Sequence, residues 1–276
     1  MKDLIVKAPA KINLSLEILQ KRADGFHELV TLMVPLKELY DELLFRPASE
    51  FSFSCDMDGV PTDERNLVVR AVKLFEREAQ LSVAYHIHLQ KAVPHGAGLG
   101  GGSSDAAFTL LTLNSLHNEP LSFECLHQLA SELGSDVPFF LYQSACICRG
   151  RGELIEPVTG PDFTVCLIKP QFGVPTPDAF TRWQSSSEVK GFQYASQQGP
   201  FGEMKNDLER PVFEKFLFLG DLKNWLLDQP EVSVAQMSGS GSTMIAIVTD
   251  KESGDALIQR ALEQIDDELF THCGQC

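Results

Sequence analysis

One glycine-rich segment decides how this chain is interpreted: Pro94-His95-Gly96-Ala97-Gly98-Leu99-Gly100-Gly101-Gly102-Ser103-Ser104-Asp105-Ala106-Ala107. It holds five glycines in seven positions and lies between residues 83–89, which alternate like a strand, and residues 103–117, which predict a helix. Glycine lets backbone N–H groups point inward, and a helix start adds the positive end of its dipole. The segment therefore predicts a loop that binds a polyphosphate.

Other glycine motifs fit the loop less well. Gly96, Gly98 and Gly101 satisfy the G-x-G-x-x-G pattern, but the acidic residue that a dinucleotide-binding unit needs about 20 positions later would fall in helical sequence. The chain has neither a Walker A loop nor a G-x-S-x-G elbow. A dinucleotide-dependent oxidoreductase and an ATP sensor without transferase activity stay as alternatives from other classes.

The composition indicates a globular protein. Hydrophobic residues make up 43% of the 276 and charged residues 22%, enough for one large domain or two modest ones. The formal net charge is −15, and so acidic a chain repels nucleic-acid phosphates. No stretch predicts a membrane span or a signal peptide. We therefore expect a cytoplasmic protein without a nucleic-acid or membrane partner.

Cysteine and histidine patterns give little support for a metal site. The seven cysteines are an odd number without zinc-site spacing, which favours reduced thiols. His86 and His88 share one face of a predicted strand, but no third ligand is evident, and we expect them to face solvent.

Strand and helix patterns alternate along the chain and predict an α+β fold. Strands are expected at residues 4–6, 12–18, 29–36, 51–55, 83–89, 145–149, 163–169, 232–237 and 244–249. Helices are expected at residues 66–80, 103–117, 122–133, 213–227 and 254–270. Residues 185–202, rich in Ser, Gln and Gly, predict a flexible connection or lid. A boundary near 157–161 suggests domains at 1–158 and 159–276.

The glycine-rich segment resembles the second signature of the GHMP small-molecule kinases, the family of galactokinase, homoserine kinase, mevalonate kinase and phosphomevalonate kinase. Ala8-Pro9-Ala10-Lys11-Ile12-Asn13-Leu14 resembles the family's first motif, and Ser238-Gly239-Ser240-Gly241-Ser242-Thr243 resembles its third. The resemblance implies two domains, a ribosomal-S5-like N-terminal one and a ferredoxin-like C-terminal one, with the active site between them.

Further stretches resemble one branch of this family, whose substrate is methylerythritol joined to cytidine through a diphosphate. They are Arg22-Ala23-Asp24-Gly25-Phe26-His27, Asn66-Leu67, Gly134-Ser135-Asp136-Val137-Pro138-Phe139-Phe140 and Pro175-Thr176-Pro177. The resemblance implies an ATP- and Mg²⁺-dependent kinase of the substrate's 2-hydroxyl in non-mevalonate isoprenoid synthesis. A homoserine-type or mevalonate-type GHMP kinase is the alternative. We expect a monomer or weak homodimer.

The resemblance makes Asp136 and Lys11 the catalytic residues. A carboxylate within hydrogen-bond reach can accept the proton of the attacking hydroxyl. Lys11 beside it would keep the carboxylate ionised and counter the charge on the transferring group. From the residues alone, a turn or cap is the commoner role for an aspartate between Gly134 and Pro138, and a lone strand lysine is usually solvated.

Substrate contacts are implied for five side chains. Phe26 and Phe180 would stack on the two faces of cytosine, while His27 meets its hydrogen-bonding edge. Asn13 is similar to positions that line the methylerythritol portion, and Thr176 to positions that line the cytidine. The family usually has Tyr at position 26, so Phe26 keeps the stacking and loses any hydrogen bond of that hydroxyl.

The resemblance also implies the ATP contacts, at the glycine-rich loop and at the start of the helix at 66–80. These residues are Pro94, Gly96, Gly98, Leu99, Gly100, Gly101, Gly102, Ser103, Ser104 and Asn66. By residue type alone Asn66 is also a good helix cap. Ser103, Ser104 and Asp105 could contact Mg²⁺ by position, but the sequence does not identify the metal ligands. Asn114, in an otherwise apolar stripe, needs a hydrogen-bond partner.

Overall fold

The computed structural model describes residues 2–276, whose contacts divide into two units. Unit 1 holds the described residues up to 10, together with 39–93 and 100–143; unit 2 holds 11–38, 94–99 and 144–276. Two strands, β1 (Leu4–Lys21) and β2 (His27–Pro47), contribute residues to both units. The contact units are therefore interleaved along the chain, and the sequence division at 158/159 stays a prediction.

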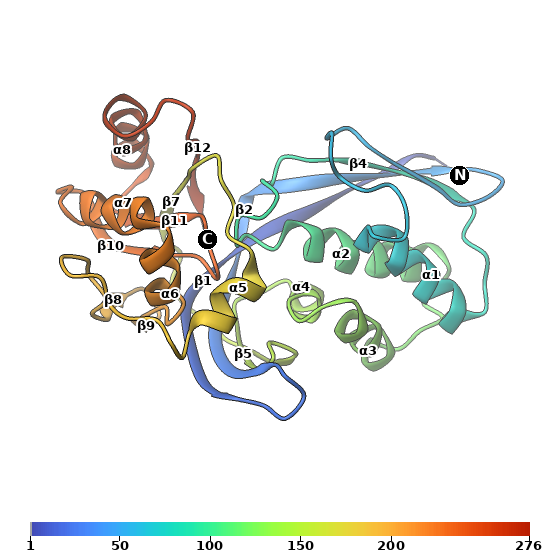
Figure 1. Cartoon of the computed structure of the whole chain (residues 1–276). Coiled ribbons are helices and arrows are strands. Elements are labelled where there is room, and N and C mark those ends of the chain that lie inside the picture. Colours follow the sequence, from blue (N-terminus) through green and yellow to red (C-terminus); the bar gives the residue numbers. More distant parts are fainter. Residues whose placement is uncertain (1) are drawn as a thin grey trace. The chain divides into compact units, whose positions relative to one another are not determined.

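Unit 1 combines strands with four helices. Strand β3 (Ser52–Cys55) pairs parallel with β4 (Tyr85–Gln90), and β4 pairs antiparallel with residues 42–47 of β2. Figure 1 shows the helices of this unit on one side of these strands. They are α1 (Leu67–Ala79), α2 (Gly101–Leu116), α3 (Phe123–Leu133) and α4 (Val137–Tyr142). Large aromatic side chains, among them Phe45, Phe75 and Phe139, are fully buried in this unit.

Helix α1 illustrates how local sequence sets an element. Its apolar stripe is buried at Val68, Val69, Ala71, Val72 and Phe75. The helix ends at a left-handed residue, Gln80, with φ 52°. The predicted helix at 66–80 is confirmed.

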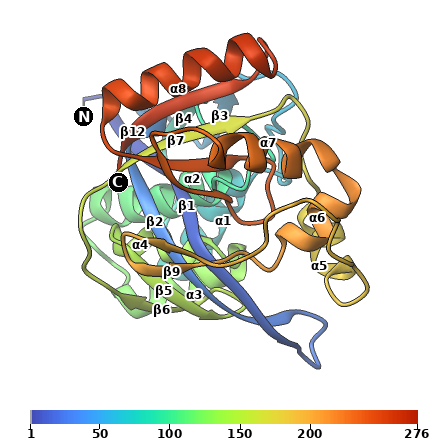
Figure 2. The ribbon, with the colours of Figure 1, turned by 90° about the vertical axis from the view of Figure 1, so that its left-hand side faces the viewer.

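Unit 2 is built on a four-stranded antiparallel sheet with the order β10-β11-β7-β12. These strands are β7 (Thr164–Lys169), β10 (Val232–Met237), β11 (Met244–Val248) and β12 (Phe270–Gln275). Helices of this unit are α5 (Thr176–Arg182), α6 (Glu209–Lys215), α7 (Leu217–Leu227) and α8 (Lys251–Gln264). Figure 2 shows α8 lying along β12. Together the two units confirm the predicted α+β class.

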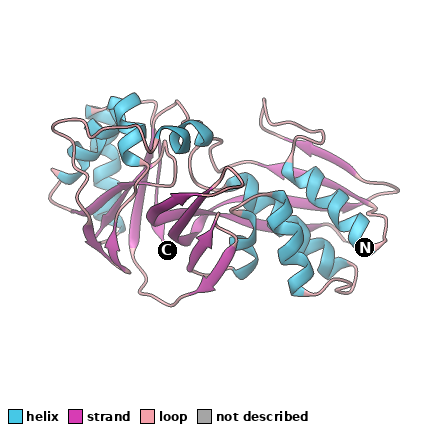
Figure 3. Ribbon diagram, turned by 60° about the horizontal axis from the view of Figure 1, so that its bottom comes forward, coloured by secondary structure: helices cyan, strands magenta, loops and turns pink. Residues whose placement is uncertain are grey.

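Shorter ladders complete unit 2. Residues 29–33 of β2 pair with β5 (Cys146–Gly150), which pairs with β6 (Leu154–Pro157). The hairpin of β8 (Gln197–Gly199) and β9 (Gly202–Met204) lies next to β10, where Gln197 exchanges two hydrogen bonds with the backbone of Ala235. Figure 3 distinguishes these strands from the helices by colour.

Several expectations need correction. The predicted helix at 254–270 ends at Gln264, and the chain then forms β12 because it pairs along β7. The predicted helix at 213–227 is two helices that meet at Phe216. Residues 185–202 are not all flexible connection, since they include β8 and the ring of Phe192 packs on Phe213. His86 and His88 lie on the face of β4 opposite its buried residues, as expected, but they are half-buried and hydrogen-bond serines of β3.

All seven cysteines are free in this structure, and the reduced state of the thiols stays a prediction. Five of the seven are buried. Cys273 of β12 pairs in register with Cys166 of β7, so the C-terminal segment is part of the sheet.

Candidate active site

Strand β1 carries a buried ammonium group. Lys11 and Asn13 are two positions apart, and residues so spaced share one face of a strand. Each is only 3% exposed. Lys11 Nζ donates to Asn13 Oδ1 at 2.6 Å and to the Gly98 carbonyl oxygen at 3.1 Å. Lys11 is therefore a held, desolvated cation, in contrast to the usual solvated strand lysine.

Asn13 is oriented by partners at both ends of its side chain. Its Oδ1 accepts from Lys11, and its Nδ2 donates to Thr31 Oγ1 at 2.8 Å. Thr31 Oγ1 in turn donates to the Ser15 carbonyl oxygen at 2.6 Å. Because every one of these groups has a partner, the amide of Asn13 has one favoured orientation, with its oxygen toward Lys11.

The glycine loop touches the C-terminal glycine turn, residues 238–243. Gly98 has φ +75°, and a Cβ there would lie 2.3 Å from the Ser238 carbonyl oxygen. No side chain other than hydrogen fits at that distance. Ser238 Oγ donates to the Gly98 carbonyl oxygen at 3.1 Å, and the Thr243 N–H donates to the Ala97 carbonyl oxygen at 3.3 Å.

The same turn touches β1. The Asn13 N–H donates to Ser238 Oγ at 3.2 Å, across 225 positions of sequence. Gly239 has φ +56°, and a Cβ there would lie 2.9 Å from Asn13 Oδ1 and 3.6 Å from Lys11 Nζ. Parts of all three sequence motifs, represented by Lys11, Gly98 and Ser238, therefore meet within unit 2.

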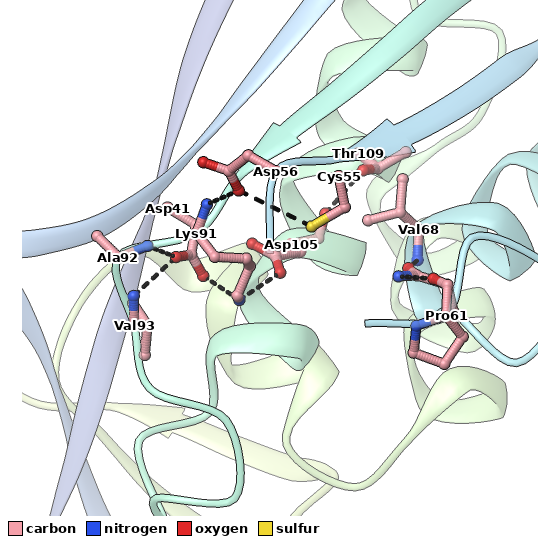
Figure 4. Close-up of polar contacts among 11 residues, drawn as sticks. Asp41, Cys55, Asp56, Pro61, Val68, Lys91, Ala92, Val93, Asp105 and Thr109 are labelled. Atoms are coloured by element: carbon pink, nitrogen blue, oxygen red, sulfur yellow. Dashed lines mark hydrogen bonds and ion pairs between the residues drawn. The ribbon is translucent and has the colours of Figure 1, made fainter. Parts of the chain in front are cut away.

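In unit 1, a buried charged cluster flanks the loop in sequence (Figure 4). This acidic cluster consists of Asp41, Lys91 and Asp105. Lys91 Nζ contacts Asp41 Oδ2 and lies 3.0 Å from Asp105 Oδ2. Asp41 Oδ1 accepts the N–H groups of Ala92 at 2.7 Å and Val93 at 2.8 Å. The cluster thereby ties the chain before the loop to the second turn of α2 after it.

Burial governs the ionisation of the acidic cluster. It raises the pKa of Asp105 to about 7, with Lys91 opposing the rise and Asp41 adding to it. For Lys91, burial alone would lower the pKa, but the carboxylates of Asp105 and Asp41 outweigh it and leave the pKa above its usual value. Within residues 2–276, Asp105 Oδ1 and Ser104 Oγ are buried without a hydrogen-bond partner. Sequence reasoning missed this cluster.

Asp136 stands at the start of α4 in unit 1. It is half-buried and precedes Val137, with Pro138 in the first turn of the helix. Its backbone is helical, at φ −88° and ψ −12°, and its side chain makes no capping hydrogen bond to α4. Asp136 therefore lies in a turn, as the residues alone predict, but its side chain does not cap α4.

The two asparagines of unit 1 have structural partners. Asn66 Oδ1 accepts the Val68 N–H at 2.8 Å, which confirms its fitness as a cap, and its Nδ2 donates to the Pro61 carbonyl oxygen at 2.8 Å. Asn114 exchanges two hydrogen bonds of 3.0 Å with the backbone of Leu121. These bonds supply the hydrogen-bond partners that the buried amide of Asn114 needs in its otherwise apolar stripe.

The residues expected near a cytosine all lie in unit 2. The ring of His27 stacks on Phe180, with centroids 5.4 Å apart and 28° between the planes. Phe26 is 49% exposed, and the Arg151 guanidinium lies 4.7 Å from its ring centroid. Burial lowers the pKa of His27, and the charge of Lys21 lowers it further. In this structure the ring that faces Phe180 is thus His27.

The glycine turn has one further contact among the predicted substrate residues. Thr176, at the start of α5, has its Oγ1 2.8 Å from Ser240 Oγ.

Through residues 2–276 no group of three or more His, Cys, Asp or Glu side chains is arranged to hold a metal ion. Over the same residues, none of the helices has the length and apolar character to cross a membrane.

Comparison with known protein families identifies the class. The family of GHMP kinases N-terminal domains matches residues 66–144, and that of GHMP kinases C-terminal domains matches residues 193–267. Together with the three converging motifs, these matches define a GHMP kinase. Kinases of this family use ATP as a substrate, so the oxidoreductase interpretation of the glycine loop is set aside.

Relatives narrow the class further. The chain is 42% identical to the 4-diphosphocytidyl-2-C-methyl-D-erythritol kinase of Methylacidiphilum infernorum over 92% of this chain and 90% of the relative. It is 36% identical to the chloroplastic/chromoplastic kinase of the same name from Solanum lycopersicum, over 88% of this chain and 64% of that longer protein. The chain therefore belongs to the 4-diphosphocytidyl-2-C-methyl-D-erythritol kinase family of GHMP kinases.

Solved structures agree with this assignment. A crystal structure of 4-(cytidine 5'-diphospho)-2C-methyl-D-erythritol kinase matches with a TM-score of 0.80 and 32% identity, over 99% of this chain and 98% of that one. Homoserine kinase from Cytophaga hutchinsonii matches with a TM-score of 0.74 at 21% identity, over 100% and 95% of the two chains. The second likeness concerns the fold alone.

Proposed function

We propose that this protein transfers the γ-phosphoryl group of ATP to the 2-hydroxyl of 4-diphosphocytidyl-2-C-methyl-D-erythritol, a step of non-mevalonate isoprenoid synthesis. The observation that carries the proposal is the buried ammonium of Lys11, held by Asn13 and Gly98 at the glycine loop. The names of the relatives support the choice of substrate. The cytoplasmic location, the lack of a nucleic-acid partner and the monomeric or weakly dimeric state stay predictions.

The reaction is an in-line displacement at phosphorus. The 2-hydroxyl oxygen forms a bond to the γ-phosphorus, the bond from that phosphorus to the bridging oxygen breaks, and ADP leaves. Asp136, which precedes α4, would accept the proton of the hydroxyl, as the family resemblance implies. Lys11 counters the negative charge on the transferring group, and Asn13 orients both Lys11 and the sugar alcohol.

ATP would bind through the glycine loop and the start of α2. A helix N-terminus offers unpaired N–H groups and a positive dipole end to phosphate oxygens. Ser104 suits the same end, because its hydroxyl is buried and has no protein partner within residues 2–276. Mg²⁺ bound with ATP would neutralise charge on the β- and γ-phosphates, and Ser104 is the side chain that would hold it. Asn66 would contact adenine with the hydrogen-bonding capacity left beyond its cap.

The cytidine portion would bind near Phe26, His27 and Phe180, with Thr176 beside it. Two aromatic rings can hold a base by stacking, for about 1 to 3 kcal/mol per base. The lowered pKa of His27 keeps its imidazole neutral at pH 7, and a neutral imidazole can both donate to and accept from a cytosine edge. Replacing Phe26, His27 and Phe180 together by alanine should then raise the KM for this substrate.

The decisive variant is Asp136→Asn, which keeps the size of the side chain and removes the base. We expect kcat to fall by at least about 100-fold, with the KM values for both substrates changed little, because the loss is in the transition state. Phosphorus NMR would follow ADP and the new phosphomonoester. Asp250→Asn, a capping aspartate of α8, is the matched control and should keep wild-type kcat.

Two outcomes would contradict the proposal in different ways. An Asp136→Asn enzyme with near-normal kcat would refute the role of the base. A wild-type enzyme that phosphorylates mevalonate or homoserine but not the cytidine compound would keep the GHMP kinase class and refute the substrate.

A further inference from the structure

Asn206, which precedes α6, is a buried side chain outside the three motifs. It is 3% exposed. Its Nδ2 donates to the carbonyl oxygens of Met237 and Gly239, both at 2.7 Å, and its Oδ1 accepts the Leu208 N–H at 2.9 Å. Both N–H groups of the amide therefore donate to backbone carbonyls at the glycine turn. One acceptor is Met237, which precedes the turn, and the other is Gly239 within it.

A buried ion pair binds the N–H of Met237, the residue that precedes the glycine turn. Glu209 Oε1 accepts the Met237 N–H at 2.9 Å, and its Oε2 lies 2.6 Å from Lys223 Nζ. The two charged side chains are 3% and 2% exposed. Met237 thus has its carbonyl fixed by Asn206 and its N–H fixed by Glu209, immediately before Ser238.

The turn held in this way touches the candidate catalytic lysine. Gly239, whose carbonyl accepts from Asn206, leaves room for no more than a hydrogen atom beside Asn13 Oδ1 and lies close to Lys11 Nζ. Ser238 joins the turn to the backbone of Asn13. A shift of the turn would therefore displace the acceptor that fixes Lys11, and all of these contacts lie within unit 2.

We propose that Asn206 is a positioning residue for phosphoryl transfer: its amide fixes the carbonyls of Met237 and Gly239, and the turn so fixed keeps Asn13 and the Lys11 ammonium in place. The inference rests on the proposed role of Lys11. A neutral amide suits the task, because two carbonyl oxygens need two donors and an unpaired charge would be costly to bury.

The kinetic test uses Asn206→Asp. This variant keeps the shape of the side chain but replaces the two N–H donors by a carboxylate oxygen, which cannot donate to the carbonyls of Met237 and Gly239. We expect kcat to fall about 10-fold or more at pH 8 while the KM values change less than about 3-fold, because Lys11 acts on the transferring group. Burial raises a carboxyl pKa, and a protonated carboxyl can donate one hydrogen bond. The kcat of the variant relative to wild type should therefore recover in part between pH 8 and pH 6.

Gln197→Ala is the matched control. Gln197 makes the same kind of paired contact, an amide on the backbone of Ala235, but two residues before Met237 on β10. It should remove a comparable contact and leave kcat at the wild-type value.

A second measurement does not depend on turnover. Hydrogen–deuterium exchange of a peptide spanning 237–243 should be faster in Asn206→Asp and unchanged in Gln197→Ala. Unchanged exchange in Asn206→Asp, or wild-type kcat in the folded variant, would overturn the inference. If that variant does not fold, Asn206→Ser, which can satisfy one carbonyl, should show an intermediate loss of kcat, and wild-type kcat there would overturn it equally. Failure of the wild-type enzyme to phosphorylate the cytidine compound would instead refute the proposed function and leave the exchange measurement valid.

Discussion

The two glycine-rich segments are supported by different chemistry. The loop at 94–102 is flanked by the acidic cluster, in which two carboxylates share one ammonium. The turn at 238–243 is held by the neutral amide of Asn206 and by the balanced pair, Glu209 with Lys223. Glycine has no side chain with which to anchor itself, so polar side chains fix the backbone of the turn itself and of the two residues that precede the loop.

The two supports differ in charge balance. The acidic cluster has one carboxylate more than it has cations, and the pKa of Asp105, at about 7, lies near neutral pH. Burial also raises the pKa of Glu209, but Lys223 and the Met237 N–H oppose that rise. The glycine loop is therefore flanked by a cluster with one carboxylate in excess, whereas the glycine turn is held by a neutral amide and a charge-balanced pair.

Lys91→Met should have the largest effect, because it leaves Asp41 and Asp105 buried together without a cation. Removing one partner of a buried ion pair costs about 3 to 5 kcal/mol, and here two acids lose their partner. We expect at least this loss in the free energy of unfolding at pH 8, and a smaller loss at pH 5.5, where protonation relieves the repulsion. Circular dichroism during denaturant unfolding would measure it.

The control for Lys91→Met is Lys73→Met, which removes an exposed partner of Glu64 in the same unit. It should cost less than about 1 kcal/mol at either pH. Equal losses for Lys91→Met at the two pH values would remove the contrast between the supports.

Lys223→Met should follow, with a loss of about 3 to 4 kcal/mol, because Glu209 is left charged, buried and without its cation. Adding Glu209→Gln should restore more than half of this loss, since glutamine still offers an oxygen to the Met237 N–H. Unfolding of the single and double variants at pH 7.5 would show it. A double variant no more stable than Lys223→Met would mean that the pair acts by more than mutual neutralisation.

Asp105→Asn tests the pH dependence of the acidic cluster. The pKa of Asp105 is about 7 in the folded protein, above the usual value of 3.8, so the folded state retains a proton that the unfolded state has lost. Its contribution to stability therefore falls as pH rises from about 4 through about 7. Asparagine does not titrate, and the loss of stability between pH 5 and pH 8 should shrink by about 1 to 3 kcal/mol.

Thermal unfolding at both pH values would measure this change. Asp162→Asn, at a carboxylate that is 75% exposed, is the control and should keep the wild-type pH dependence. If Asp105→Asn kept the wild-type pH dependence of stability, a group other than Asp105 would be responsible for that dependence.

The three motifs were predictable because each is one short contiguous stretch: two are rich in glycine and serine, and the first carries Lys11 and Asn13 two positions apart. The acidic cluster was not, since Asp41 is one of two adjacent acidic residues within β2, and its partner Lys91 is 50 positions away. Asn206 likewise acts on residues 31 and 33 positions later, and no local pattern links them. Strand β12 was missed because residues 270–275 form a strand only through pairing with β7.

Thr176→Val should give the smallest effect and shows whether α5 shares in supporting the turn. The change removes the hydrogen bond to Ser240, at a threonine that is itself exposed, so the stability loss should stay below about 1 kcal/mol. We expect the KM for the cytidine substrate to rise about 2- to 5-fold with little change in kcat, because Asn206 still holds the turn. Thr181→Val, which removes a hydroxyl contact to Pro177 on the same helix, should leave both constants unchanged. If kcat in Thr176→Val instead fell as far as in Asn206→Asp, the position of Lys11 would depend on Thr176 as much as on Asn206. The comparison of the acidic cluster with the support of the turn would then have to include the contact between the hydroxyls of Thr176 and Ser240.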